Sequence, residues 1–387
     1  MSLYPAEDER RIRTQALVRE WTKSGLLDAA QGAALDAELR VNVRRTNIFL
    51  RGGLALFTTL IVTAFVALIV IINHLDQPIP SAVVAGVSAV VCAGLAHFLV
   101  VRERFYRFGV EEALAILAVA LMACSACFFT YAQDVSRIGD TAIVAGLITG
   151  AVGGLIVYWR FGYVYAAIGA IACIGYAPYE LLITASMKHG LSAVLLAAAF
   201  VGARLQHARY GDEYPGDDYG WMQAAAWAGL YFTLNLHIPF AFALYDVGAP
   251  FYWFTYAMIW ALPLAGLALA IRGRDRGLLD VCLVMLLVTF LTNKPYLGWP
   301  RHEWDPILLG VFLMAAAIIV RRWLASGVNG QRAGFTPARI LSSQKGAVTI
   351  LGTASAGFHP NAPSYPESGS GGFDGGKSGG GGAAGTY

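Results

Sequence analysis

Hydrophobic positions in this chain fall into long runs that are separated by short polar turns. The clearest run covers 52–72 and holds about twenty apolar residues without a charge, which is enough for a helix to cross a bilayer. Nine further runs follow, so the pattern predicts an all-α, polytopic membrane protein with about ten transmembrane helices within residues 46–322. The expected spans are 52–72, 81–101, 113–131, 141–158, 162–182, 187–204, 221–245, 251–271, 278–292 and 306–320.

Residues 1–45 are too polar to belong to this set, and they predict a small cytosolic helical segment. A first helix is expected over 6–24, with Gly25 as its C-terminal cap, and Asp28 is placed to cap a second helix over 29–39. Two such helices are too short to enclose a hydrophobic core of their own. They are therefore expected to pack on each other, on the membrane surface or on a partner.

The C-terminal part of the chain, 323–387, has a different composition. Its last section, 369–387, consists mostly of glycine and serine, which cannot bury a core. This composition predicts a flexible cytosolic tail. Together with 1–45, residues 335–387 are the segments expected to engage a cytosolic protein partner.

The basic residues predict the orientation of the spans, because loops on the cytosolic side of a membrane carry an excess of arginine and lysine. With a cytosolic N-terminus, the inner side holds Arg40, Arg44, Arg45, Arg51, Arg102, Arg104, Arg107, Arg160, Arg204, Arg209, Arg272, Arg274, Arg276, Arg321 and Arg322. The outer side holds Arg137, Lys188, Lys294 and Arg301. The bias alternates from loop to loop, which requires an even number of spans and predicts that both termini are cytosolic.

Composition agrees with repeated spans. The chain is 57% hydrophobic and 14% charged, whereas soluble domains carry about 25% charged residues. The net charge of +3 does not indicate a nucleic-acid partner, because the basic residues flank apolar runs. The lipid bilayer is the expected partner. All five cysteines lie in apolar runs, where cysteine behaves as a small hydrophobic residue, so no disulfide framework is expected.

No catalytic, cofactor-binding or metal-binding motif is visible in the sequence. The chain has no phosphate-binding glycine loop after a strand, no nucleophile elbow and no HExxH sequence. Cys124 and Cys127 have CxxC spacing but lie within an apolar run, and the loop with His302, Glu303 and Asp305 lacks a known metal motif. We therefore expect no enzyme activity, no cofactor and no metal site.

No charged residue falls at the centre of a predicted span, since Glu112, Glu180 and Asp280 lie only at span edges. Ion-coupled transporters and proton pumps usually place a charged group within the membrane. This pattern argues against a proton-coupled carrier, although a facilitator remains open.

The best candidate for a ligand site is a polar cluster in the outer half of the seventh span. Tyr231, Asn235 and His237 lie close together, and Pro239 cannot donate a hydrogen bond to the carbonyl of Asn235. A broken turn of this kind is tolerated in a membrane only where protein or a wet cavity satisfies it. The alternative interpretation is a proline kink whose polar groups bond to neighbouring helices.

A second polar cluster ends the fifth span on the same outer side. Pro178 frees the carbonyl of Ile174, and Glu180 could approach His237 near the outer mouth. The predicted ligand-binding residues are therefore Tyr176, Glu180, Tyr231, Asn235 and His237. The alternative is an interfacial aromatic belt with a solvated carboxylate.

Small residues recur on two neighbouring spans and predict close helix packing. The fourth span carries them at every fourth position, and the fifth span has a matching stripe. The residues are Gly146, Gly150 and Gly154 on the fourth span, and Gly162, Ala166, Gly169 and Cys173 on the fifth. Because only 159–161 connects the two runs, a tight helical hairpin is expected.

Two local patterns resemble known proteins. A signature before the first span consists of Trp21, Gly25, Leu26, Leu27, Asp28 and Gln31. Within residues 15–75, it resembles an uncharacterised family of predicted bacterial polytopic membrane proteins with a short N-terminal cytosolic helical segment. Residues 379–387 are similar to the glycine-rich, aromatic-terminated tails of some bacterial membrane proteins with an extracytoplasmic phosphatase-like domain, which is not visible here. Both resemblances imply a bacterial inner-membrane location, and neither brings catalytic residues.

Two classes of function follow from these patterns. The lack of central charges favours a non-enzymatic membrane scaffold or sensor that engages partners through its cytosolic ends, as a monomer or a homo-oligomer. The broken fifth and seventh spans favour a small-solute permease or binding protein.

Overall fold

The structure is a computed structural model that describes residues 3–327 apart from 5, 24–25, 75–76, 134–139, 211–217, 239–247, 274, 301 and 303. Within these residues the chain is all-α, and its only β-type pairing is an isolated bridge between Arg44 and Phe105. The predicted all-α class is therefore confirmed for this part of the chain. Almost all of the predicted tail, from residue 328 on, lies outside the described residues, as does Gly25 with its predicted cap.

The N-terminal segment forms a helical hairpin of α1 (Ala6–Lys23) and α2 (Ala29–Glu38). Asp28 caps α2 as predicted: its Oδ1 accepts from the Gln31 amide at 2.7 Å, and Gln31 Oε1 accepts from the Asp28 amide at 3.2 Å. This reciprocal pair is a capping box. Arg19 Nε lies 2.8 Å from Asp36 Oδ1 across the hairpin, and this hydrogen bond holds the pKa of Asp36 below its usual range.

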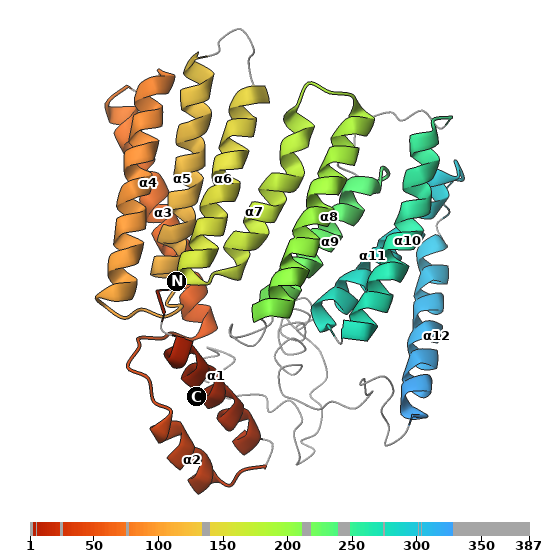
Figure 1. Ribbon diagram of the computed structural model, residues 1–387, viewed down its shortest axis with the longest axis horizontal. Coiled ribbons are helices and arrows are strands. Elements are labelled where there is room, and N and C mark those ends of the chain that lie inside the picture. The colour runs from red at the N-terminus through yellow and green to blue at the C-terminus, as the bar shows by residue number, and fades with distance from the viewer. Residues whose placement is uncertain are drawn as a thin grey trace, which may run out of the picture. The chain divides into compact units, whose positions relative to one another are not determined.

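The membrane part runs from α3 to α12, with neighbouring helices in α3 to α7 packed side by side (Figure 1). Its helices are α3 (Ile48–Ile72), α4 (Pro78–Val101), α5 (Val110–Gln133), α6 (Asp140–Phe161), α7 (Val164–Tyr176), the 3₁₀ turn η1 (Ala177–Glu180), α8 (Ala185–Tyr210), α9 (Asp218–Leu234), α10 (Pro250–Gly273), α11 (Arg276–Tyr296) and α12 (Asp305–Ala325). Each of the ten expected spans overlaps one of these helices.

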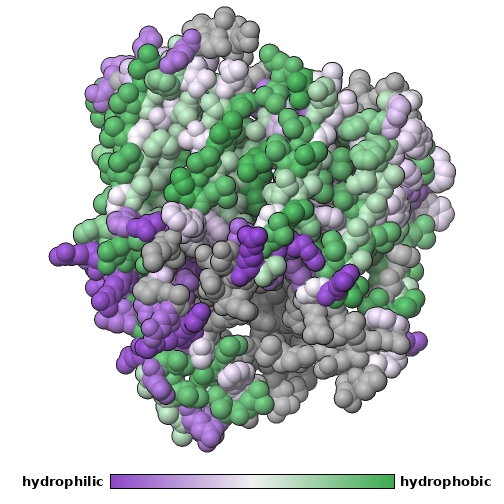
Figure 2. All heavy atoms as spheres, in the orientation of Figure 1, coloured by the Kyte–Doolittle hydropathy of each residue, from purple (hydrophilic) through white to green (hydrophobic). Residues whose placement is uncertain are grey.

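Seven of the described helices are long and apolar enough to cross a membrane: α3, α4, α5, α6, α8, α10 and α11. This arrangement is that of a multi-pass membrane protein. Apolar side chains cover the membrane helices in Figure 2, while hydrophilic side chains gather at the helix ends next to the N-terminal hairpin. α3 buries no residue in the structure, and Phe49 and Phe57 are 90% and 65% exposed, as expected for a helix that faces lipid.

The seventh expected span, 221–245, is wrong over Asn235 to Ile238. α9 ends at Leu234, and Asn235 to Ile238 form a turn, while 239–247 lies outside the described residues. The sequence offers a physical reason, because Pro239 has no amide hydrogen and its ring disfavours a helical conformation in the residue before it. Asn235 and His237 therefore lie after a helix end and not within a continuous span.

Two hydrophobic clusters hold the helices together. One joins helices α7 to α11 and includes Tyr231, Ile259 and Leu278, which are fully buried. The other joins helices α4 to α7 near the N-terminal segment and includes Tyr4 of that segment and Tyr163. The N-terminal segment thus shares a core with the helices that follow it, an arrangement that is not among the three expected for it, although α1 and α2 also contact each other.

Candidate functional site

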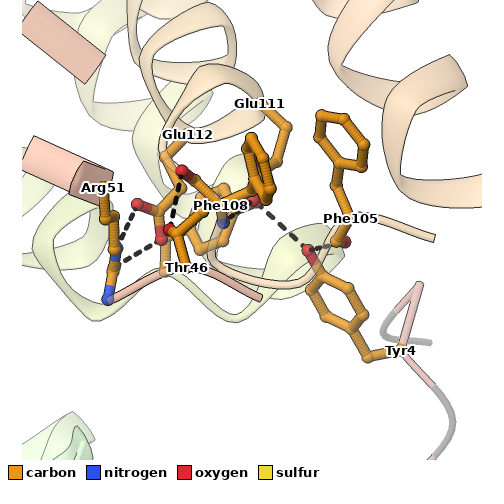
Figure 3. A network of polar contacts seen from close by, with 8 residues as sticks. Tyr4, Thr46, Arg51, Phe105, Phe108, Glu111 and Glu112 are labelled. Carbon is orange, nitrogen blue, oxygen red and sulfur yellow. Dashed lines mark hydrogen bonds and ion pairs between the residues drawn. The ribbon is translucent and has the colours of Figure 1, made fainter. Parts of the chain in front are cut away.

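The clearest cluster of buried polar groups lies where the N-terminal segment meets the ends of α3, α4 and α5 (Figure 3). It is built on the loop between α4 and α5. This loop turns through three residues with left-handed backbone, Arg104 at φ 54°, Arg107 at φ 51° and Gly109 at φ 108°. A Cβ on Gly109 would lie 2.3 Å from the carbonyl oxygen of Arg51, so glycine is required for α5 to begin against α3.

Arg51 and Glu112 form an ion pair across this contact. Arg51 Nε donates to Glu112 Oε2 at 2.6 Å and Arg51 NH2 donates to Oε1 at 2.5 Å, a bidentate arrangement. The Glu112 side chain is 8% exposed and that of Arg51 is 28% exposed. The sequence pattern placed both residues at span edges, but it did not indicate that they pair. The ion pair fixes the inner end of α3 to α5.

Glu111 is fully buried beside this pair. Its Oε1 accepts a hydrogen bond from the Phe108 amide at 2.6 Å, which closes the first turn of α5. Its Oε2 has no hydrogen-bond partner in the part of the chain that the structure describes. A buried carboxyl group is costly unless it is neutral or paired, so Glu111 is a polar group that the fold retains at a cost.

Tyr4 joins the N-terminal segment to the α4–α5 loop and to the turn between α6 and α7. Its hydroxyl donates to the Phe105 carbonyl at 3.3 Å and lies 3.3 Å from the Tyr163 hydroxyl. Because the Tyr4 hydroxyl has one proton, the Tyr163 hydroxyl is the donor in the second pair. The Leu3 amide donates to the Arg160 carbonyl at 2.8 Å. Burial raises the pKa of Tyr4 far above its ordinary value, so the phenol stays neutral.

The extended segment around Arg44, before α3, pairs with the loop between α4 and α5. The Arg44 amide donates to the Arg104 carbonyl at 3.0 Å, and the Tyr106 amide donates to the Arg44 carbonyl at 3.1 Å. The Arg45 and Arg107 guanidinium groups lie 5.7 and 5.9 Å from the centre of the Tyr106 ring. The arginines that the sequence marks as orientation signals therefore also build the attachment of the N-terminal segment.

The predicted ligand-binding residues divide between two places. Tyr231, Asn235 and His237 meet in a polar network between α9, α10 and α11. Asn235 Nδ2 donates to the Tyr231 hydroxyl and to Thr292 Oγ1, both at 3.0 Å. His237 Nε2 lies 2.9 Å from the Tyr252 hydroxyl, which donates to the Tyr296 carbonyl at 3.0 Å.

Tyr176 and Glu180 lie at the α7–η1 end. No hydrogen bond joins Glu180 to His237 among the described residues, and Tyr176 is 52% exposed. Pro178 is buried, and α7 tightens into the 3₁₀ turn there. The neighbouring Gly175 carbonyl accepts a hydrogen bond from Ser192 at 2.5 Å. The expected approach of Glu180 to His237 therefore stays a prediction.

Two sets of buried polar residues, one on α11 and one on α8, were not predicted from the sequence. Thr289, Thr292 and Tyr296 follow one face of α11 at helical spacing, and this i, i+3, i+7 pattern is a signal that could have found them. Thr289 Oγ1 donates to the Ile259 carbonyl at 2.8 Å, which Pro263 leaves without a helical donor. The other missed residue is His189, which is buried with Nδ1 2.6 Å from the Thr233 carbonyl.

The predicted small-residue stripes lie on facing helices. A Cβ on Gly154 would meet the Ala166 carbonyl oxygen at 2.7 Å, so the α6–α7 hairpin is closest there. Gly146 instead approaches Ala123 of α5, and Gly150 lies between Ala123 and Cys173 of α7. Gly162 has φ 71° and turns the chain between α6 and α7. The stripe thus packs against both α5 and α7.

A cavity of about 520 Å³ with almost entirely apolar walls opens along this stripe. Cys124, Cys127 and Cys173 contribute to its wall, and all five cysteines are free thiols. No group of three or more His, Cys, Asp or Glu side chains that could hold a metal ion occurs in the described residues, and the expectation of no metal site stays a prediction.

Comparisons with protein-family models, with curated proteins and with solved structures found no match. The resemblance at Trp21 to Gln31 therefore stays a prediction. The structure gives this signature a local role, because the Trp21 carbonyl accepts hydrogen bonds from the Leu26 and Leu27 amides at 2.9 and 3.3 Å and Asp28 caps α2.

Proposed function

We propose that the protein is a non-enzymatic scaffold or sensor of the bacterial inner membrane, with ten spans and both termini in the cytosol. Support for ten spans comes from the lengths of three helices, α7, α9 and α12, which are not among the seven strongly apolar ones. α7 and η1 together measure about 28 Å, α9 about 26 Å and α12 about 32 Å, from their residue numbers and the rise of each helix type. These lengths are close to the hydrocarbon thickness of about 30 Å.

The observation that carries the functional proposal is the attachment of the N-terminal hairpin to the inner helix ends. Tyr4 and Leu3 bond to two inner loops, and Arg44 bonds to one of them. A segment that served only as a leader to the first span would not need these buried contacts. The attachment couples the hairpin to the packing of α3 to α7, as a sensor or an assembly platform requires.

The free side of the hairpin supports a protein partner. Leu17, Trp21, Leu26 and Leu35 are 38%, 39%, 73% and 37% exposed. Large exposed apolar side chains on a small cytosolic segment are typical of an interaction surface. The second segment proposed to engage a partner, 335–387, lies outside the described residues.

Photo-crosslinking in living cells tests the scaffold proposal. A photoreactive amino acid replaces Leu26 in the turn between α1 and α2, and a matched variant carries it at Glu38, which is exposed at the C-terminal end of α2. We expect a discrete protein adduct from position 26 and at most a weak one from position 38. Equal adducts at both positions, or no protein adduct at position 26, would contradict the proposal.

The alternative function is a small-solute permease or binding protein. The observation that favours it is the row of amide, phenol and imidazole groups from Tyr231 to His237, beside the helix end at Leu234. Thermal stabilisation of the purified protein by a panel of small solutes tests it. Binding that is lost in His237→Gln but kept in His302→Gln, a variant of an exposed outer histidine, would favour the alternative.

The proposal includes a homo-oligomer as one form of the scaffold. The exposed apolar face of α3 is the surface available to a second copy as well as to lipid. Native mass spectrometry of the detergent-solubilised protein measures the copy number. A dimer that persists at low detergent concentration would support self-assembly, and a monomer under all conditions would leave lipid as the neighbour of α3.

A further inference from the structure

A second cavity, of about 390 Å³, lies between the N-terminal hairpin and the inner end of α4. The cavity along the small-residue stripe is almost entirely apolar, whereas the wall of this second cavity is half polar and half apolar. Its charged residues are Arg11, Arg40, Arg104 and Asp8, so three guanidinium groups face one carboxylate. The cavity is therefore a positively charged site with an apolar side.

Two of these arginines form no ion pair with the acidic residues that the structure describes. Arg11 pairs with Glu7 at 2.7 Å on the exposed face of α1. Neither Arg40 nor Arg104 forms an ion pair within the part of the chain that the structure describes. Both are exposed, and Arg104 has a left-handed backbone conformation that is uncommon for a residue with a side chain. A planar guanidinium group matches the geometry of phosphate oxygens.

The apolar wall continues onto a membrane helix. Val100 and Val101, the last residues of α4, line the cavity together with Val43 and Ile12. On the outside of the same turn, Phe98 and Val101 are 51% and 56% exposed. A ligand with a phosphate group in the cavity would thus have an apolar helix face beside it on which to lay hydrocarbon chains.

We propose that this cavity binds the headgroup of an anionic phospholipid, with its phosphate at Arg40 and Arg104 and its acyl chains along the inner end of α4. Basic pockets at the cytosolic ends of membrane helices are typical sites for such headgroups. The proposal goes beyond the scaffold function and does not depend on it, since it requires only that α4 crosses the membrane. It would make the position of the hairpin sensitive to the lipid composition of the membrane.

Native mass spectrometry of the full-length protein in a neutral detergent tests the proposal. Phosphatidylglycerol and phosphatidylcholine are titrated as probes against the wild type and against an Arg40→Gln, Arg104→Gln variant. The matched control is Arg209→Gln, Arg272→Gln, which removes two exposed inner arginines at the ends of α8 and α10. A second variant, Arg40→Lys, Arg104→Lys, keeps the charge and reports whether the site still folds.

We expect the wild type to prefer phosphatidylglycerol and the Gln variant to bind it about 30-fold more weakly, from about fivefold per arginine near a membrane surface. The control should lose less than about threefold, and the lysine variant should keep most of the affinity. An equal loss in the control, or no preference for the anionic lipid, would overturn the proposal. Displacement of the lipid by inorganic phosphate would also overturn it and assign the cavity to a soluble anion.

Discussion

At the scale of single residues, close approach and hydrogen bonding decide which positions matter. Among the glycines of the α6 stripe, Gly154 faces a backbone oxygen, whereas Gly150 faces Cys173 Sγ at 3.5 Å and Ala123 Cβ at 3.7 Å from the place of an added Cβ. A flexible neighbour can move, but the backbone of α7 cannot move without opening the hairpin. An added Cβ on Gly146 would also meet a backbone oxygen, that of Ala123, at 3.2 Å. Gly154 is therefore the most critical position of the stripe, Gly146 is tight, and Gly150 is the most tolerant.

The first prediction concerns this stripe. Gly154→Ala should destabilise the protein by about 1–3 kcal/mol, because the added methyl group overpacks the α6–α7 contact, and Gly150→Ala should cost less than about 1 kcal/mol. Thermal unfolding of the purified protein in detergent measures both variants. Equal losses of stability would show that the two helices separate or approach differently from the described packing.

The second prediction concerns Tyr4. Tyr4→Phe removes the donor to the Phe105 carbonyl and the acceptor for Tyr163, so it should loosen the N-terminal hairpin by about 1–2 kcal/mol. Hydrogen–deuterium exchange over residues 6–23 measures the effect, with Tyr131→Phe as a control at an exposed position near the other end of α5. Unchanged protection in Tyr4→Phe would mean that these hydrogen bonds do not hold the hairpin.

At the scale of elements, ion pairs and caps join helices that hydropathy alone leaves separate. α3 has almost no buried surface, and its position against α5 depends on the Arg51–Glu112 pair and on the contact with Gly109. The loop between α4 and α5 is therefore an ordered connector.

The third prediction uses that pair. Glu112→Gln should destabilise the membrane part by about 2 kcal/mol or more, because it leaves a partly buried guanidinium group without its carboxylate, and adding Arg51→Gln should recover part of the loss. Unfolding in mixed detergent micelles measures the cycle. The exposed Arg19–Asp36 pair is the control, and its removal should cost much less than removal of the partly buried pair, because solvent screens it. Additive losses at Arg51 and Glu112 would contradict a direct interaction.

Most elements, but not their lateral contacts, could be predicted from the sequence. Long apolar runs and the Asp28–Gln31 capping box are local signals, and they correctly indicate α3 to α6 and the start of α2. The pairing of Arg51 with Glu112 and the network around Asn235 depend on which helices become neighbours. Hydropathy carries no such information, so the sequence suggested a meeting of Glu180 with His237, whereas the structure joins His237 to Tyr252.

At the scale of the whole molecule, the number of spans decides where the two ends of the chain lie. Ten spans place both termini on one side, whereas the seven helices of the strongly apolar set alone would place them on opposite sides. The inner arginines and the lengths of α7, α9 and α12 favour ten. The proposals for the hairpin and for the lipid site both concern the side on which residues 1–45 lie.

The fourth prediction is the most direct test of this arrangement. A reporter that is active only in the cytosol and one that is active only outside it are fused in turn to the N-terminus and to a point after Ser326. We predict cytosolic activity at both fusion points, because an even number of spans returns the chain to its starting side. Activity on opposite sides would require an odd number of spans and would contradict the ten-span arrangement.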